Sequence, residues 1–143
     1  MTGTDQSGST PATVADVMLR EPLEVAPEDT LGEAAEKLDE RDVGSALVTE
    51  YGRLIGIVTS RDLVRALAGR IHSSEARVRD WMTAEPVTAD PSTTIDEARA
   101  LMLEHGFHHL PVAVDGRPVG VVGLRAVVPG ARGATASPAR SDR

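Results

Sequence analysis

The chain has 143 residues, enough for one domain or two very small ones. It contains no cysteine, which excludes disulfides and cysteine-based metal or redox sites. The formal net charge of −7 and the presence of one Trp, one Tyr and one Phe argue against a nucleic-acid partner. Apolar runs are too short to span a bilayer and the N-terminus lacks a signal sequence, so we expect a cytoplasmic protein without membrane contact.

The sequence repeats itself after 64 residues without a gap. Over residues 14–64, 17 of 51 positions are identical to the residue 64 positions later. A repeat of this kind indicates two copies of one structural unit. The predicted organisation is an N-terminal tail, a first repeat, a connector, a second repeat and a C-terminal tail, at 1–12, 13–69, 70–77, 78–128 and 129–143. Both tails have too few apolar residues to form a core and are predicted to be disordered.

The two repeats predict the same elements in the same order. A short extended segment comes first, at 23–26 and 87–89. A helix follows in each repeat, opened by the capping-box pattern Thr-x-x-Glu at Thr30 and Thr94. Next come two nearly continuous apolar strands, 45–49 and 54–58 in the first repeat and 110–114 and 119–122 in the second.

A last helix is predicted at the end of each repeat. In the first repeat it covers 60–68 and ends at Gly69. In the second repeat Pro129 and Gly130 limit it to a brief turn. The elements together predict an α+β fold with two βαββα-type repeats. One repeat alone would leave a sheet face uncovered, so we expect the two to pack sheet to sheet about a pseudo-twofold axis, with two related clefts between them.

Each repeat resembles a CBS domain, and the chain resembles a tandem CBS pair, or Bateman module. The resemblance covers about residues 12–128 and rests on four motifs: Asp-Val-Met before a proline, the helix, the Ser-Ala-Leu-Val or Leu-Pro-Val strand, and Gly-Ile-Val-Thr-x-x-Asp. It implies a regulatory sensor rather than an enzyme. The implied ligand is an adenine nucleotide, AMP first and ATP second, with S-adenosylmethionine as a further candidate. It also implies a homodimer and an unknown protein partner that reads the ligand-induced change.

The implied ribose site lies at the start of the helix over 60–68. By the resemblance, Thr59 and Asp62 hold the ribose hydroxyls, and a carboxylate can accept two hydroxyl protons at once. The spacing Thr-x-x-Asp is also that of a helix N-cap with an acidic third residue, so capping alone is the alternative. The two roles can alternate. The second repeat has Gly123 and Ala126 in these places and therefore lacks both the hydroxyl and the carboxylate.

The implied phosphate side comes from the other repeat. By the resemblance, His108 and His109 meet the phosphates, and Arg61 is a further candidate because it lies in the first helical turn. Arg125 occupies the place of Arg61 in the second repeat, where no ribose motif accompanies it, so a role without a ligand is the alternative for Arg61. The alternative for the histidines is that they are surface side chains without a ligand. The first repeat has no basic residue in the places of His108 and His109. The two complementary halves therefore predict one working cleft in each chain.

The implied adenine pocket is apolar. Its predicted lining residues are Ile57, Val87, Phe107 and Pro111, with ordinary core packing as the alternative for Ile57 and Val87. A rival interpretation takes His105, His108 and His109 as metal ligands, but their spacing is poor and no metal site or cofactor is expected. No catalytic motif supports an enzyme. The alternative function is a structural or protein-interaction CBS module without a ligand, in which Thr59 and Asp62 only cap the helix.

Overall fold

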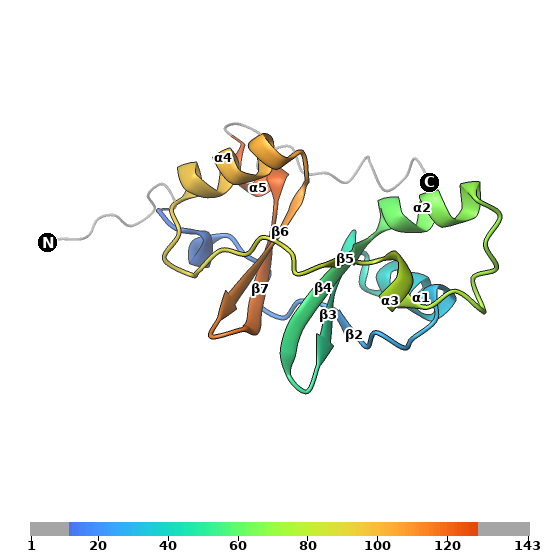
Figure 1. The fold of residues 1–143 in the computed structure, drawn as a ribbon. Helices are drawn as coiled ribbons and strands as arrows, with labels where there is room; N and C mark the ends of the chain where they lie inside the picture. Colours follow the sequence, from blue (N-terminus) through green and yellow to red (C-terminus); the bar gives the residue numbers. More distant parts are fainter. Residues whose placement is uncertain (1–11, 129–143) are drawn as a thin grey trace, which may run out of the picture.

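The computed structural model describes residues 12–128. Two antiparallel strand pairs form the middle of the molecule (Figure 1). β3 (Ser45–Glu50) pairs with β4 (Arg53–Thr59), and β6 (His109–Val114) pairs with β7 (Arg117–Gly123). Short β2 (Glu24–Val25) and β5 (Thr83–Ala84) extend the first sheet to the order β2-β3-β4-β5. The predicted tails, apart from Ala12, lie outside the described residues.

The second sheet reproduces the first with single bridges in place of its short strands. Ala89 bridges to Val112 in parallel, as β2 pairs with β3. Leu19 bridges to Val121 in antiparallel, as β5 pairs with β4. The predicted strands are thus confirmed to within one or two residues at each end.

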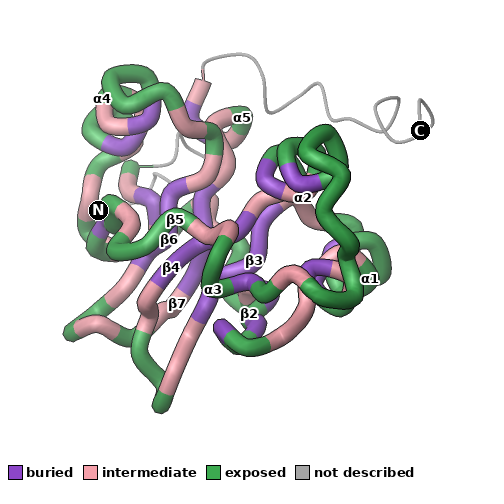
Figure 2. Tube along the Cα trace, turned by 45° about the vertical axis from the view of Figure 1, so that its right-hand side comes forward, coloured by how far each residue is buried: buried purple, intermediate pink, exposed green. Residues whose placement is uncertain are grey.

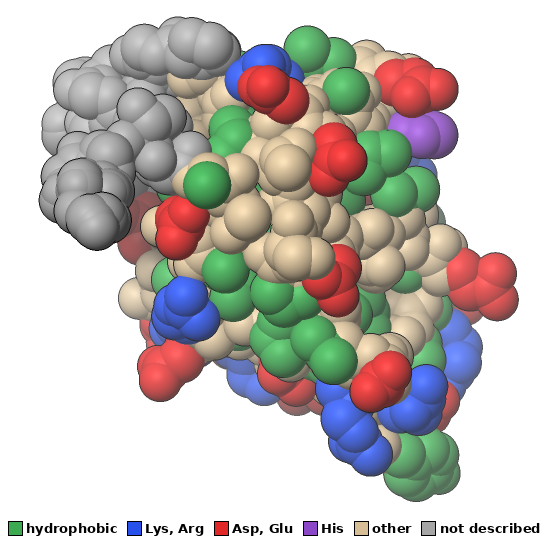
Figure 3. Space-filling model, turned by 90° about the vertical axis from the view of Figure 1, so that its left-hand side faces the viewer, with side chains coloured by type: hydrophobic (Ala, Val, Ile, Leu, Met, Phe, Trp, Pro, Cys, Tyr) green, Lys and Arg blue, Asp and Glu red, His purple; other side chains and the backbone are tan. Residues whose placement is uncertain are grey.

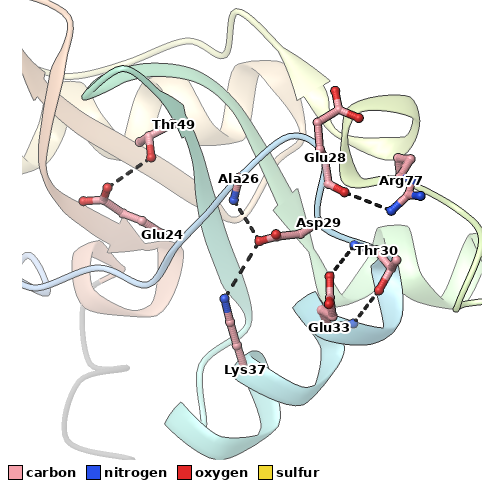
Figure 4. Close-up of polar contacts among 9 residues, drawn as sticks. All are labelled: Glu24, Ala26, Glu28, Asp29, Thr30, Glu33, Lys37, Thr49 and Arg77. Atoms are coloured by element: carbon pink, nitrogen blue, oxygen red, sulfur yellow. Dashed lines mark hydrogen bonds and ion pairs between the residues drawn. The ribbon is translucent and has the colours of Figure 1, made fainter.

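The two longer helices begin where the capping boxes predict. α1 (Leu31–Arg41) follows Thr30, whose Oγ1 accepts from the backbone N–H of Glu33 at 3.0 Å, while Glu33 Oε1 accepts from the N–H of Thr30 at 2.9 Å (Figure 4). α4 (Ile95–His105) follows Thr94, which exchanges the same two bonds with Glu97 at 3.1 and 2.9 Å. Each box satisfies backbone donors that a helix start leaves free.

The remaining helices are short, and two of them, α2 and α5, follow the sequence signals. α2 (Ser60–Ala68) ends at Gly69. Its counterpart α5 (Leu124–Val127) is brief, as predicted from the proline that follows it. A 3₁₀ turn, η1 (Val14–Asp16), and the one-turn helix α3 (Val78–Trp81) open the two repeats.

The opening segment of each repeat packs into the core of the other repeat. Val78 belongs to the core beneath α1, and Val14 belongs to the core beneath α4. The backbone at Gly56 lies against Met82, and that at Gly120 lies against Met18, so closely that any side chain at either glycine would collide with the methionine sulfur. The two repeats are therefore interlocked, and each needs the other to complete its core.

The repeats meet sheet to sheet. Leu47, Ile57 and Val121 form a buried cluster between the two strand pairs, with Leu54 packed against it. The N–H of Leu54 donates to the carbonyl of Gly116 across the junction at 2.8 Å. Figure 2 shows the buried residues concentrated on the central strands, with exposed residues along the outer sides of the helices. The predicted α+β class with two repeats packed sheet to sheet is confirmed.

The outer surface carries mixed charge. On the face drawn in Figure 3, acidic and basic side chains are interspersed, with hydrophobic side chains between them. None of the helices within residues 12–128 has both the length and the apolar character that a membrane-spanning segment requires.

Candidate ligand-binding site

A cleft of about 620 Å³ opens between the repeats at the N-terminal end of α2. Three segments line the cleft: the end of β4 with the first turn of α2, Thr83 with residues 85–87 beside β4, and residues 106–109 with Pro111 from the second repeat. In Figure 1 the connection from β5 to α4 runs across the junction of the two halves. All nine residues singled out from the sequence line this cleft: Ile57, Thr59, Arg61, Asp62, Val87, Phe107, His108, His109 and Pro111. The structure thus brings both predicted half-sites together.

Five lining residues were not predicted from the sequence: Ser60, Thr83, Glu85, Pro86 and Gly106. Glu85 and Pro86 carried a signal, because the same pair recurs as Glu21 and Pro22 in the first repeat. Glu85 has a φ of +49°, a conformation that residues other than glycine seldom adopt. Its carboxylate adds a second acidic group, beside Asp62, to the lining.

Asp62 is the central polar group of the cleft. Its residue exposure is 7%, and its carboxylate accepts three hydrogen bonds. Oδ2 accepts from the backbone N–H of Thr59 at 2.8 Å and from Thr59 Oγ1 at 3.3 Å. Oδ1 accepts from Nη1 of Arg65 at 2.5 Å. Asp62 therefore caps the backbone N–H of Thr59 at the start of α2, and the ribose role remains a prediction beside this contact.

The two histidines lie at the other side of the cleft in different surroundings. His108 is exposed, whereas His109 is partly buried, with its ring against the backbone of Gly44. Burial lowers the pKa of His109 below 6.5, and the nearby charge of His108 lowers this pKa further. His109 is therefore predominantly neutral at pH 7.

The metal interpretation gains no support from the third histidine. The ring of His105, at the end of α4, stacks on the ring of Phe107 with centroids 5.7 Å apart. In the part of the chain that the structure describes, no three His, Asp or Glu side chains converge as a ligand set.

The apolar residues that line the cleft differ in how far they are buried. Ile57 belongs to the buried cluster between the sheets and also lines the cleft, so the two interpretations of this residue hold together. Pro111 is fully buried at the floor, and Phe107 is half-buried. Val87 is 37% exposed, which does not fit the core-packing alternative for this residue.

Proline at position 111 explains why the cleft is open beside Val87. In the first repeat the N–H of Leu47 donates to the carbonyl of Leu23 at 2.8 Å, and Leu23 is only 6% exposed. Pro111 and Val87 occupy the matching places, but proline has no N–H to donate. The pairing resumes at Ala89, whose N–H donates to the carbonyl of Pro111 at 2.9 Å. The bond between Leu47 and Leu23 therefore has no counterpart from Pro111 to Val87.

Pro111→Ala is expected to close this part of the cleft. The new N–H can donate to the Val87 carbonyl, and a net hydrogen bond of about 0.5–1.5 kcal/mol would then have to be broken before a ligand enters. We expect the amide of residue 111 to exchange slowly with deuterium and AMP to bind about two- to tenfold more weakly. Pro118→Ala, in β7 and outside the cleft, is the matched control. An unprotected amide at position 111 with unchanged AMP affinity would contradict the explanation.

The related positions on the other side of the pseudo-twofold axis lack the same groups. The residues in the places of Thr59, Asp62, His108 and His109 are Gly123, Ala126, Gly44 and Ser45. In the place of the half-exposed Val87 stands the buried Leu23. Polar groups that could hold a nucleotide are therefore concentrated on one of the two related sides.

Paired repeats of this kind, joined through their sheets with a cleft between them, define a class of tandem-repeat α+β proteins. The CBS domain family matches the chain twice, over residues 14–69 and 78–129. The chain therefore belongs to the CBS domain family, as a tandem pair.

Named relatives agree with this assignment. The CBS domain-containing protein YhcV of Bacillus subtilis is 30% identical over 113 residues, which are 79% of this chain and 81% of that protein. The chain also matches the inosine-5'-monophosphate dehydrogenase of Nitrosopumilus maritimus at 30% identity, but it spans only 20% of that enzyme. This second match therefore carries no catalytic part of the larger protein.

Two solved structures of similar fold contain adenosyl compounds. The CBS domain protein PAE2072 of Pyrobaculum aerophilum, complexed with AMP, is 25% identical with a TM-score of 0.75, covering 80% of this chain and 88% of that one. The CBS domain pair of protein MJ0100, in complex with 5'-methylthioadenosine and S-adenosyl-L-methionine, is 26% identical with a TM-score of 0.75, covering 80% and 95%. CBS pairs similar to this chain thus bind adenosyl ligands.

Proposed function

We propose that this protein is a regulatory module that binds one adenine nucleotide, with AMP as the preferred ligand, in the cleft at the start of α2. The observation that carries the proposal is the convergence of Thr59 and Asp62 from one repeat with His108 and His109 from the other in a single cleft. The matching positions across the pseudo-twofold axis have none of these groups. AMP in the similar protein PAE2072 supports the ligand class.

Each part of the ligand has a partner of suitable chemistry. The Asp62 carboxylate accepts from the ribose hydroxyls, and such charge-assisted bonds are strong. The Val87 carbonyl accepts from the adenine amino group, with the ring between Ile57 and Pro111. The phosphate lies toward His108, His109 and the start of α2, where backbone N–H groups and the helix dipole favour an anion.

The charge of the lining favours a monophosphate over a triphosphate. Of the residues that line the cleft, only Arg61 is a lysine or arginine, and it is exposed. Asp62 and Glu85 place two carboxylates in the same cleft. A triphosphate brings several negative charges that this lining would not balance, because the repulsion of like charges persists in a partly desolvated cleft. AMP is therefore expected to bind more tightly than ATP.

The test is a thermal-shift titration of the full chain with adenosine, AMP, ATP and S-adenosylmethionine. A ligand that binds only the folded state raises the melting temperature as its concentration increases. At a free ligand concentration one hundred times Kd, the free energy of unfolding rises by about 2.7 kcal/mol. We expect AMP to give the largest shift at equal concentration. No shift with any of the four at millimolar concentration would contradict the proposal, and a larger shift with ATP would contradict the preferred ligand.

The pKa of His109 sets the pH dependence expected in this titration. Burial holds this pKa below 6.5 in the free protein, and an adjacent phosphate favours the imidazolium and raises the pKa in the complex. Protons are therefore taken up on binding, and the affinity for AMP should rise as the pH falls through and below 6.5, while adenosine serves as the control without phosphate. The free protein should lose stability over the same range, because the unfolded chain binds the proton more readily. An AMP affinity that stays flat from pH 5.5 to 8 would remove His109 from the phosphate site.

The homodimer and the protein partner belong to the same proposal. Val64 and Leu67 on α2 are 63% and 68% exposed, and Leu103 on α4 is 62% exposed. Val64 and Leu67 lie three residues apart on α2, and apolar side chains exposed together on one helix face support a contact with another protein. They also support the alternative function, an interaction module without a ligand. Sedimentation analysis distinguishes monomer from dimer, and the titration above distinguishes sensor from ligand-free module.

A further inference from the structure

The guanidinium group of Arg65 connects Asp62 to the segment that leads into Thr83 and residues 85–87 of the cleft lining. Arg65 lies one helical turn after Asp62 in α2, and its Nη1 donates to Asp62 Oδ1 at 2.5 Å. Its Cζ atom lies 5.5 Å from the centroid of the Trp81 ring, within the range of a cation–π contact. One side chain therefore contacts both the carboxylate and the indole.

Trp81 lies two residues before Thr83, the first residue of this segment that lines the cleft. It is the last residue of α3 and packs, partly buried, against the core of the first repeat. The chain continues into β5, where Thr83 pairs with Ile57, and then into Glu85 and Val87, which line the cleft. A displacement of Trp81 is thus carried within a few residues to the lining itself.

The positions related to this set by the 64-residue repeat carry none of its three side chains. The residues in the places of Asp62 and Arg65 are Ala126 and Pro129, and the residue in the place of Trp81 is Val17. A contact needed only to hold the repeated fold would be expected on both sides. The carboxylate, the arginine and the tryptophan occur together only beside the cleft that also carries His108 and His109.

We propose that Arg65 is a positioning residue that fixes the Asp62 carboxylate for the ribose hydroxyls and links occupancy of the cleft to Trp81. This inference rests on the proposed function. The side chain of Asp62 is 10% exposed, so its charge needs a partner within the protein. Thr59 occupies Oδ2, and Arg65 leaves an acceptor position on Oδ1 for a hydroxyl. A hydroxyl bound there draws on the same oxygen, weakens the bond to Arg65 and shifts the guanidinium over the indole.

The single tryptophan of the chain makes the contact measurable. We expect AMP to change the emission of Trp81 in the wild-type protein, with a midpoint equal to the Kd from isothermal titration calorimetry. Arg65→Gln should bind AMP about tenfold more weakly, because the carboxylate is no longer held in place. The same variant should bind 2',3'-dideoxy-AMP within about twofold of the wild type, because that ligand lacks the hydroxyls on which Arg65 acts.

Arg99→Gln is the matched control. Arg99 pairs with Asp96 at 2.6 Å and at the same spacing of three residues, but on α4 and outside the cleft lining. It should leave the AMP affinity and the emission change unaltered. Calorimetric AMP binding without an emission change, or an equal loss of AMP and dideoxy-AMP affinity in Arg65→Gln, would overturn the role of Arg65 and leave the proposed function intact. No calorimetric binding of AMP to the wild type would overturn both.

Discussion

Asp62→Ala is expected to abolish the thermal shift produced by AMP. The carboxylate is the strongest acceptor predicted for the ribose, and two charge-assisted hydrogen bonds together contribute about 3–6 kcal/mol. Their loss corresponds to an affinity at least about a hundredfold lower. The variant should also lose about 0.5–2 kcal/mol of stability, because Asp62 accepts from the backbone N–H of Thr59 at the start of α2. Thermal shift with AMP and urea unfolding without ligand measure the two effects separately.

Glu97→Ala separates capping from binding. Glu97 holds the third position of the capping box of α4, as Asp62 does in α2, but it lies outside the cleft lining. It should lose comparable stability and keep the full AMP shift. If Asp62→Ala also kept the full shift, Thr59 and Asp62 would be a helix cap alone, and the interaction module would be the better description of the protein.

Local signals predicted the elements well because each one acts over a few residues. The capping boxes at Thr30 and Thr94 place the helix starts, and Gly69 and Pro129 limit the last helices. The nine predicted cleft residues required the resemblance to a family as well as spacing. Thr59 and Asp62 are close in sequence, but only the packing of two repeats brings His108 to the same cleft.

The features missed from the sequence depend on long-range packing. Nothing in the spacing indicates that Val14 completes the core of the second repeat and Val78 that of the first. The contact between Arg65 and Trp81 depends on the same exchange, because it places α3 beside α2. The effect of Pro111 was available in principle: the 64-residue overlay sets it against Leu47, and a missing N–H follows from the residue type alone.

The asymmetry between the repeats separates the fold from the site. Glycines 56 and 120 and the methionines packed on them are present in both repeats, where they hold the opening segments against the sheets. By contrast, the residues at the positions related to Thr59, Asp62, Arg65, His108 and His109 are of other types. A ligand in this cleft would contact both repeats at once and would favour whichever relative arrangement binds it better. The difference in ligand affinity between the two arrangements sets how far the ligand shifts their populations, and the proposed partner would recognise the favoured arrangement.

Leu47→Ala is expected to be strongly destabilising. Leu47 is fully buried between the sheets, in contact with the cluster of Ile57 and Val121. Truncation of a buried leucine to alanine costs about 2–5 kcal/mol, because transfer energy is lost and a cavity remains. Since the cavity would adjoin Ile57, which lines the cleft, AMP affinity should fall as well. Urea unfolding and calorimetry with AMP measure the two effects.

Leu31→Ala distinguishes a contact between the repeats from a contact within one of them. Leu31 is equally buried, but it lies in α1, within the core of the first repeat and outside the cleft lining. It should lose a similar free energy of unfolding while the surviving folded protein binds AMP normally. Saturating AMP should restore part of the stability of Leu47→Ala, because binding stabilises only the folded state. Equal AMP affinity in both variants would show that the junction around Leu47 holds the fold together without shaping the cleft.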